Sequence, residues 1–150
     1  MPVASRVSQF INQQGLICQQ VHHPRSLNFA QAIEEAQAIP ELCAEVVTII
    51  DVDGPAVAVI PFSTELDLEV LNQTLGRKFQ ALSASNAGKL FKDCEPGMFP
   101  VLAMAYGLPV VVDLSLLDHD FVFSASGCSS TLLKIPGSSF RTAMRGAIKG

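Results

Sequence analysis

The sequence contains few of the residues that small disulfide-bonded or metal-binding proteins need. Its 150 residues include four cysteines, three histidines, one tyrosine and no tryptophan. The cysteines are widely spaced and form no CxxC pair, so we expect neither a metal site nor a disulfide framework. The longest apolar runs are too short to cross a bilayer, and residues 1–14 lack the apolar segment of a secretory signal. These absences predict a cytoplasmic protein that makes no use of a membrane.

Charge is also scarce, and its balance limits the partners that the chain can bind. Charged residues make up 16% of the sequence, and the formal net charge is −4. Broad affinity for nucleic acids requires a basic surface that displaces counterions, so we do not expect it here. Binding to one end of a nucleic acid needs few phosphate contacts and remains compatible with this charge. Apolar residues make up 49%, which is typical of a globular chain, and the length predicts one domain over residues 1–150.

Several common catalytic motifs are absent as well. There is no GxSxG elbow for a serine nucleophile, no GxxxxGK[ST] phosphate loop and no GxGxxG dinucleotide loop. His22 and His23 are adjacent, so in a strand their side chains would point to opposite faces and could not share a ligand. His119 lies between two aspartates, in a segment that we interpret as a solvated loop. No established catalytic constellation therefore emerges from the residues alone.

The hydrophobic pattern alternates between helical and strand periods and predicts a mixed α+β fold. We expect one central mixed β-sheet flanked by helices. The expected helices are 3–14, 29–38, 66–75 and 140–148, with shorter helical segments near Lys89 and at 114–117. The expected strands are 16–21, 44–50, 56–61, 79–82, 110–112, 121–125 and 132–135.

The most informative stretch runs from Lys89 to Asp113 and contains the loop Cys94-Glu95-Pro96-Gly97-Met98-Phe99-Pro100. Two prolines exclude a helix there, and Gly97 lets its amide approach a ligand closely. An apolar β-branched strand follows at 110–112. The loop is either a structural turn or a binding loop held by a core strand. Cys94 is either a small loop residue or a nucleophile or redox target, and Ser126-Gly127-Cys128-Ser129-Ser130 forms a second glycine-containing loop.

The segment CEPGMFPVLAMAYGLPVVVDLSLL resembles the glycine-proline loop and following strand of the YbaK/prolyl-tRNA synthetase editing-domain family, the trans-acting aminoacyl-tRNA deacylases. The resemblance extends from His23 to about Phe140. It implies a translation-fidelity activity, the hydrolysis of the ester that joins a wrong amino acid to the 3′ end of tRNA. It also implies that no metal or organic cofactor takes part. The backbone amides of the loop would orient the aminoacyl group, which suits a carbonyl that develops negative charge.

Carried over by position, the resemblance implies a substrate pocket with Gly97 and Pro100 on its lining and Gly127 on its opposite wall. His23 and Asn28 would lie at the edge of this pocket. The full set of expected substrate-binding residues is Gly97, Met98, Phe99, Pro100, Gly127, Ser126, His23, Asn28, Val46 and Val47.

Two positions depart from the family pattern. Family deacylases carry a lysine near the start of the strand expected at 44–50, where this chain has Val46 or Val47, and no Lys or Arg occurs between Arg25 and Arg77. A second loop proline is replaced by Val101. We therefore expect little or no deacylation unless Lys89 or Lys92 reaches the pocket. The alternatives are a silent module that binds a ligand or the tRNA end, and a structural domain without a ligand. The pattern does not predict the oligomeric state.

Overall fold

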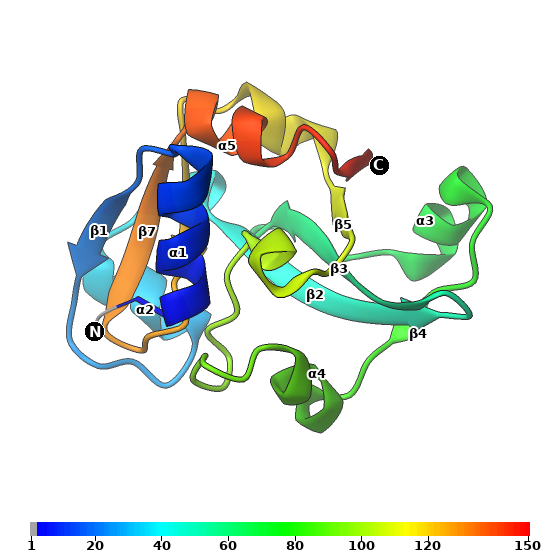
Figure 1. Cartoon of the computed structure of the whole chain (residues 1–150), viewed down its shortest axis with the longest axis horizontal. Helices are drawn as coiled ribbons and strands as arrows, with labels where there is room; N and C mark the ends of the chain where they lie inside the picture. Colours follow the sequence, from blue (N-terminus) through cyan, green and yellow to red (C-terminus); the bar gives the residue numbers. More distant parts are fainter. Residues whose placement is uncertain (1–2) are drawn as a thin grey trace.

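The strands form two sheets, as Figure 1 shows for a computed structural model that describes residues 3–150. The larger sheet has the order β4-β2-β3-β5-β8, with antiparallel pairs around β2 and parallel pairs around β5. The smaller sheet has the antiparallel order β1-β7-β6. The strands are β1 (Gln19–His22), β2 (Ala44–Asp51), β3 (Gly54–Pro61), β4 (Gln80–Ala81), β5 (Val110–Val112), β6 (Phe121–Ala125), β7 (Thr131–Pro136) and β8 (Ile148–Lys149).

Five α-helices and three short 3-10 helices cover these sheets within the described residues. They are α1 (Ser5–Gln14), α2 (Phe29–Ala36), η1 (Pro40–Leu42), α3 (Leu68–Leu75), α4 (Ala84–Leu90), η2 (Ala103–Tyr106), η3 (Leu114–Asp118) and α5 (Gly137–Ala143). Side chains cap three of the α-helices: Asn28 at α2, Asp67 at α3 and Ser83 at α4 each accept a hydrogen bond from a first-turn amide. None of the described helices is long and apolar enough to cross a bilayer.

The β2–β3 hairpin forms the backbone of the larger sheet. Its register pairs Asp51 with Gly54 across a two-residue turn, so alternate residues from Asp51 back toward Cys43 exchange hydrogen bonds with β3. The amide of Phe62 donates to the carbonyl of Cys43 at 2.8 Å, which agrees with this register. The residues between them, including Val46, direct their backbone N–H and C=O groups toward the other edge.

Only the distal half of that edge is covered. Strand β4 pairs with Ile49 and Ile50, and the amide of Leu82 adds a hydrogen bond to the carbonyl of Thr48 at 3.0 Å. The bridge from Cys43 to Phe123 covers the start of the strand, and from Glu45 to Val47 no strand pairs with this side of β2 within residues 3–150. The sheet therefore offers an open strand edge at one end of the hairpin.

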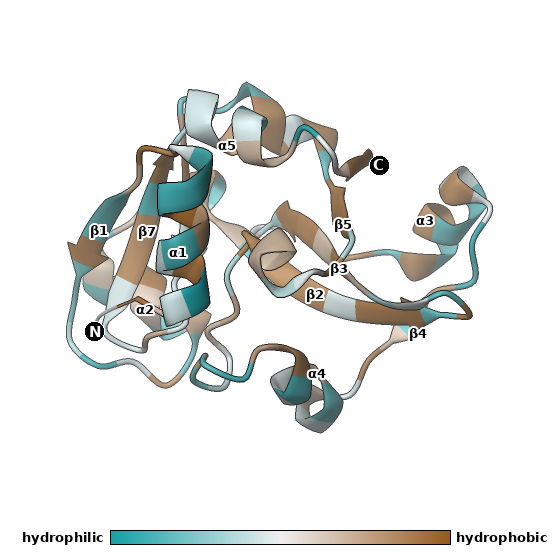
Figure 2. Ribbon diagram, viewed as in Figure 1, coloured by the Kyte–Doolittle hydropathy of each residue, from teal (hydrophilic) through white to brown (hydrophobic). Residues whose placement is uncertain are grey.

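The apolar strands of both sheets face a shared interior. Figure 2 shows β2, β3, β5 and β7 as mainly hydrophobic, whereas the outward faces of α1 and α4 are hydrophilic. The sheets meet at an isolated parallel bridge between Cys43 and Phe123. The largest fully buried side chains include Phe91, Phe140 and Leu133. This interior fixes the positions of the loops that leave it.

The structure confirms the mixed α+β class and corrects two details of the prediction. We expected one sheet, but the strands divide between two, because β1, β6 and β7 pair among themselves. The expected closing helix at 140–148 is wrong. Helix α5 ends at Ala143, and Ile148–Lys149 pair in parallel with β5 as β8. The Lys149 ammonium donates to the carbonyls of Met144, Arg145 and Ala147 at 2.9–3.1 Å and so stabilises the turn.

Candidate functional site

A cavity of about 740 Å³ lies between the open edge of β2, helix α4 and the loop from Cys94 to Phe99. Its lining consists mainly of small and apolar side chains. The lining residues are Phe29, Glu45, Val46, Val47, Thr48, Ala81, Leu82, Ala84, Ser85, Ala87, Gly88, Cys94, Pro96, Gly97, Phe99 and Ala125. The volume lies within the range of small-molecule binding sites, which are typically concave and apolar with few polar groups.

The β2 wall of the cavity comprises four consecutive residues, Glu45 to Thr48. Successive side chains of a strand point to opposite faces of the sheet, so a cavity over one face would contact only alternate residues. Contact with all four means that the cavity runs along the open edge of the strand. The backbone N–H and C=O groups of Val46, which point away from β3, are directed to this edge.

The opposite wall is a tightly connected loop. Gly97 has a φ of +76°, a left-handed conformation that glycine adopts without steric cost, and a Cβ at this position would lie 3.9 Å from the Cα of Asn28. The amide of Met98 donates to the carbonyl of Glu95 at 3.1 Å and closes the turn. Gly97 and Phe99 line the cavity, and within residues 3–150 their own amides donate no backbone hydrogen bond. The loop thus presents two free N–H donors.

The second glycine loop supports the first from behind. The amide of Glu95 donates to the carbonyl of Gly127, and the amide of Gly127 donates to the carbonyl of Met98, both at 2.8 Å. Gly127 has a φ of +89°, and a Cβ there would lie 2.6 Å from the Cβ of Ala4 and 2.9 Å from the Sγ of Cys94. The two loops are therefore held in one rigid unit against α1.

A polar side chain fixes one end of this unit, and an aromatic pair fixes the other. Before the glycine, the Asp93 carboxylate accepts hydrogen bonds from the backbone amide of Arg6 at 3.0 Å and from the hydroxyl of Tyr106. After it, the ring of Phe99 stacks on that of Phe91 with centroids 4.5 Å apart. Burial raises the pKa of the Cys94 thiol to about 11, and its Sγ lies 3.1 Å from the Tyr106 hydroxyl. A thiol with this pKa stays protonated near neutral pH, which favours a packing role for Cys94 over that of a nucleophile.

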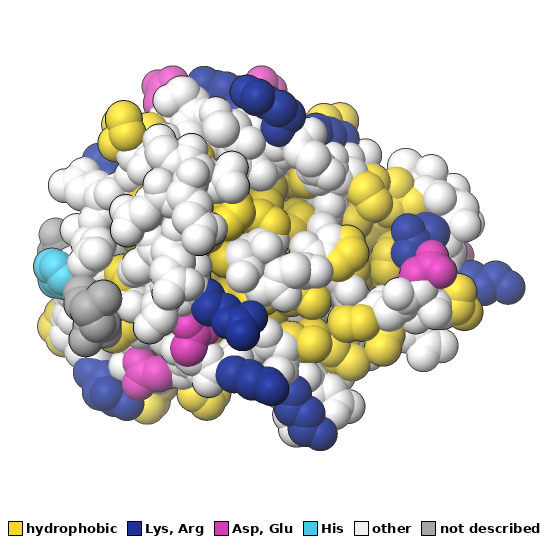
Figure 3. Space-filling view, in the orientation of Figure 1, with side chains coloured by type: hydrophobic (Ala, Val, Ile, Leu, Met, Phe, Trp, Pro, Cys, Tyr) yellow, Lys and Arg dark blue, Asp and Glu magenta, His cyan; other side chains and the backbone are white. Residues whose placement is uncertain are grey.

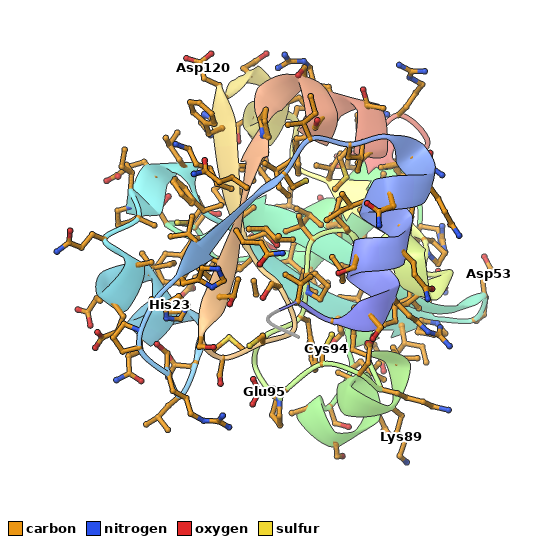
Figure 4. All side chains as sticks on the ribbon, turned by 60° about the vertical axis from the view of Figure 1, so that its left-hand side comes forward. His23, Asp53, Lys89, Cys94, Glu95 and Asp120 are labelled. Atoms are coloured by element: carbon orange, nitrogen blue, oxygen red, sulfur yellow. The ribbon has the colours of Figure 1, made fainter. Side chains whose placement is uncertain are left out.

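The Glu95 carboxylate ties the loop to the β6–β7 and β1–α2 connections. It accepts hydrogen bonds from the Ser129 amide and, at 2.8 Å, from Arg25. The hydrogen bond from the Ser129 amide and the charge of Arg25 hold the pKa of Glu95 below its usual range. Figure 4 shows Glu95 and Cys94 on this loop, with His23 on the neighbouring segment and Lys89 farther away on α4. The loop wall is therefore fixed before any ligand arrives.

Comparison with known proteins assigns the chain to a family. The model of the aminoacyl-tRNA editing domain matches residues 23–143, most of the chain. This chain belongs to the aminoacyl-tRNA editing domain family. No curated protein sequence matches it.

Solved structures show the same fold as this editing domain. A candidate trans-editing enzyme for prolyl-tRNA synthetase is 20% identical, with a TM-score of 0.82, and the match covers all of this chain and 96% of the other. A candidate signal transduction protein from Marinobacter aquaeolei VT8 is 22% identical, with a TM-score of 0.76. That match covers 97% of this chain but only 29% of the longer protein. At these identities the likeness establishes the fold.

The structure brings part of the expected site residues onto the cavity. Gly97, Phe99, Val46 and Val47 line it. Asn28 caps α2 beside Gly97, with its Oδ1 accepting from the amide of Gln31 at 2.9 Å. This placement puts the glycine loop and the strand expected to hold the substrate on facing walls.

The other expected residues lie behind the loop. The side chains of Met98 and Pro100 are buried and do not line the cavity. Gly127 was expected on the opposite wall, but it lies against Ala4 and Cys94 and, like Ser126, does not line the cavity. His23 is buried, and its Nδ1 lies 2.7 Å from the carbonyl of Pro24. These residues support the loop without contacting the cavity.

The sequence reasoning missed two parts of the lining, helix α4 and Glu45. The small residues of α4 from Ala84 to Gly88 leave space beside the strand, and only its sequence run of alanine, serine and glycine hinted at this. Glu45 is the one charged residue between Ala44 and Ile50. A single charge in an otherwise apolar strand could have indicated a functional position from the sequence. Burial raises the pKa of Glu45 above its ordinary value.

No Lys or Arg contributes to the lining among residues 3–150. Basic side chains lie outside it: Figure 3 shows them scattered over this face of the molecule, and Lys89 of α4 and the following Lys92 are exposed. The Lys89 ammonium lies 3.4 Å from the Asn86 Oδ1 on its own helix. The described residues contain no cluster of His, Cys, Asp and Glu suited to a metal ion. The cavity thus combines free amides, apolar walls and one carboxylate.

Proposed function

We propose that this cavity receives the aminoacylated 3′ end of a tRNA and that the domain hydrolyses its ester bond. The observation that carries the proposal is the arrangement of the cavity in a chain of this family. A rigid glycine loop with two free amides faces an open strand edge, and the cavity between them has a volume of about 740 Å³. The volume accommodates an aminoacyl group together with part of the terminal nucleoside, and the apolar walls suit a small or apolar amino-acid side chain.

The chemistry follows from the donors on the loop wall. Water attacks the ester carbonyl, the bond to the ribose oxygen breaks, and the products are the free amino acid and the tRNA hydroxyl. The carbonyl oxygen becomes an oxyanion in the transition state, and preorganised N–H donors are the protein groups that stabilise it. We assign this role to the amides of Gly97 and Phe99, which belong to lining residues and donate no backbone hydrogen bond within residues 3–150. The proposed setting is the cytoplasm, where charged tRNA is found.

The rate is expected to be low. A lysine at Val46 or Val47 would hold tRNA phosphate or sugar oxygens by a charge-assisted contact worth roughly 1.5–3 kcal/mol. Its loss corresponds to about one to two decades in rate or affinity. Lys89 and Lys92 lie outside the lining and supply at most a long-range attraction to the tRNA backbone.

A panel of charged and mischarged tRNAs, each assayed for release of the amino acid, tests the proposal. We expect slow but measurable deacylation of one or a few members. Gly97→Ala should reduce it by at least tenfold, because a side chain strains the left-handed backbone that aims the amides. Gly107→Ala is the matched control, since Gly107 has a φ of +72° with open space around it and does not line the cavity.

Two outcomes would contradict the proposal. Deacylation equal in the Gly97→Ala and Gly107→Ala variants would show that the loop amides take no part. Binding of charged tRNA without any turnover across the whole panel would identify a recognition module in place of an enzyme.

A further inference from the structure

Glu45 is the only charged residue among the described residues that line the cavity. It lies on the open edge of β2, beside Val46, and is half-buried. Within residues 3–150 its carboxylate forms neither an ion pair nor a hydrogen bond, although the acids Asp51 and Asp53 at the turn of the hairpin both pair with Arg77. No Lys or Arg lines the cavity to neutralise it.

A partly desolvated carboxylate of this kind gains an interaction when a ligand supplies its partner. A partly desolvated charge among apolar walls loses hydration, and the raised pKa of Glu45 reports that loss. A cation that enters the cavity would recover the lost interaction, and a charge-assisted hydrogen bond to a carboxylate is among the stronger polar contacts in proteins. The ligand group that best suits this position is therefore a small cation with N–H donors.

The proposed substrate carries such a group. An aminoacyl ester has one α-ammonium, two bonds from the carbonyl carbon that the loop amides would polarise. The Val46 carbonyl, which points to the same open edge, offers a second acceptor beside Glu45. The loop wall is thus suited to the ester oxygen, and the strand wall is suited to the amine.

We propose that Glu45 binds the α-ammonium of the aminoacyl group, so that this domain selects substrates with a free amine. The inference rests on the proposed function and adds a specificity that the ester chemistry does not require. It predicts discrimination against N-acylated aminoacyl groups and against hydroxyacyl esters, which present no cation. The electrostatic contact then comes from an acid on the strand that binds the amine, where the family pattern has a base.

Paired, non-hydrolysable probes test this directly. They are 3′-deoxy-3′-aminoacylamino-adenosines with alanyl, valyl or leucyl groups, each with a free amine and in N-acetylated form, and binding is measured by calorimetry. We expect at least one free-amine probe to bind about tenfold more tightly than its N-acetylated partner. Glu45→Gln should reduce that ratio to near one, and Glu45→Asp should retain part of it. Glu41→Gln, which removes an exposed carboxylate outside the cavity, should leave the ratio unchanged.

The outcomes separate this inference from the proposed function. Charged tRNA that is deacylated equally well with and without N-acetylation would overturn the role of Glu45 and leave the deacylase intact. A Glu45→Gln variant that keeps the tenfold ratio but loses turnover would make Glu45 a general base for water and would likewise overturn the inference. Absence of both probe binding and deacylation would remove the proposed function and the inference together. Thermal unfolding of each variant confirms that it is folded.

Discussion

The two walls of the cavity are built in opposite ways. The loop wall, from Cys94 to Phe99, is tied to the rest of the chain by backbone hydrogen bonds to Gly127 and by the side chains of Glu95 and Asp93. The strand wall, from Glu45 to Thr48, pairs with β3 along its whole length, and from Glu45 to Val47 its outer edge is open. Rigid donors on one wall and an adaptable open edge on the other suit a site in which chemistry is fixed and recognition can change. No lysine or arginine lies on the open wall among the described residues, and the rigid wall carries Gly97.

The largest effect is expected from breaking the support of the rigid wall. Gly127→Ala should lower the free energy of unfolding by about 2–4 kcal/mol, because the new Cβ would overlap Ala4 and Cys94 and would strain a backbone at φ +89°. Gly146→Ala, where a Cβ meets open space at ordinary φ, should change it by less than about 0.5 kcal/mol. Urea unfolding of both variants makes the comparison. Equal stabilities would show that the loop is not tied to α1 as the structure indicates.

The next effect is expected on the open wall. Val46→Lys or Val47→Lys restores a cation beside the cavity and should raise the deacylation rate by about tenfold on the tRNA that the wild type edits. Single-turnover assays at low and high salt measure it, since a contact to phosphate weakens as salt rises. The matched variant Val70→Lys adds the same charge at an exposed position on α3 and should leave the rate unchanged. Brisk turnover by the wild type, undiminished in a Lys89→Ala/Lys92→Ala variant, would show that the missing cation does not limit the reaction.

How far the sequence predicts each wall follows the same division. The loop could be predicted, because two prolines and a glycine restrict the backbone locally, and the quoted motif carries the family resemblance. The strand wall could be predicted only as an apolar strand. Which of its edges stays open depends on where β4 pairs, and only Ile49 and Ile50 make that pairing. Such a contact between distant segments leaves no local pattern.

The elements show a similar contrast between local and distant causes. The start of α2 at Phe29 and the strand at Val110–Val112 follow from neighbouring residues and were predicted. The end of α5 was not, because Ile148 and Lys149 leave the helical pattern to pair with β5 across the molecule. The resemblance implies a position for Gly127 on the wall opposite Gly97, whereas in the structure Gly127 approaches Ala4 closely and does not line the cavity.

The smallest predicted effect concerns Glu45 and the pH dependence of stability. Burial raises its pKa in the folded state above the ordinary value of 4.5, so the folded chain binds more protons than the unfolded chain just above that pH. The free energy of unfolding of the wild type should therefore fall as pH rises through this window, relative to Glu45→Gln, which cannot titrate. Glu45 is half-exposed and screened by solvent. Between about pH 4 and pH 7 the free energy of unfolding of the wild type should therefore fall, relative to Glu45→Gln, by only a few tenths of a kcal/mol.

Urea unfolding of Glu45→Gln and Glu41→Gln at several pH values in that range measures the difference, with Glu41 as an exposed acid outside the cavity. A wild type that gains stability over Glu45→Gln as pH rises would mean that the carboxylate already has a favourable partner in the folded chain. The open wall would then be satisfied without a ligand, and the reason to expect an ammonium there would disappear. The expected result is that the wild type loses stability relative to Glu45→Gln as pH rises, and that this loss disappears when a free-amine probe is bound. It would show that Glu45 on the strand wall gains its partner from the substrate, whereas the hydrogen bonds of the loop wall form without a ligand.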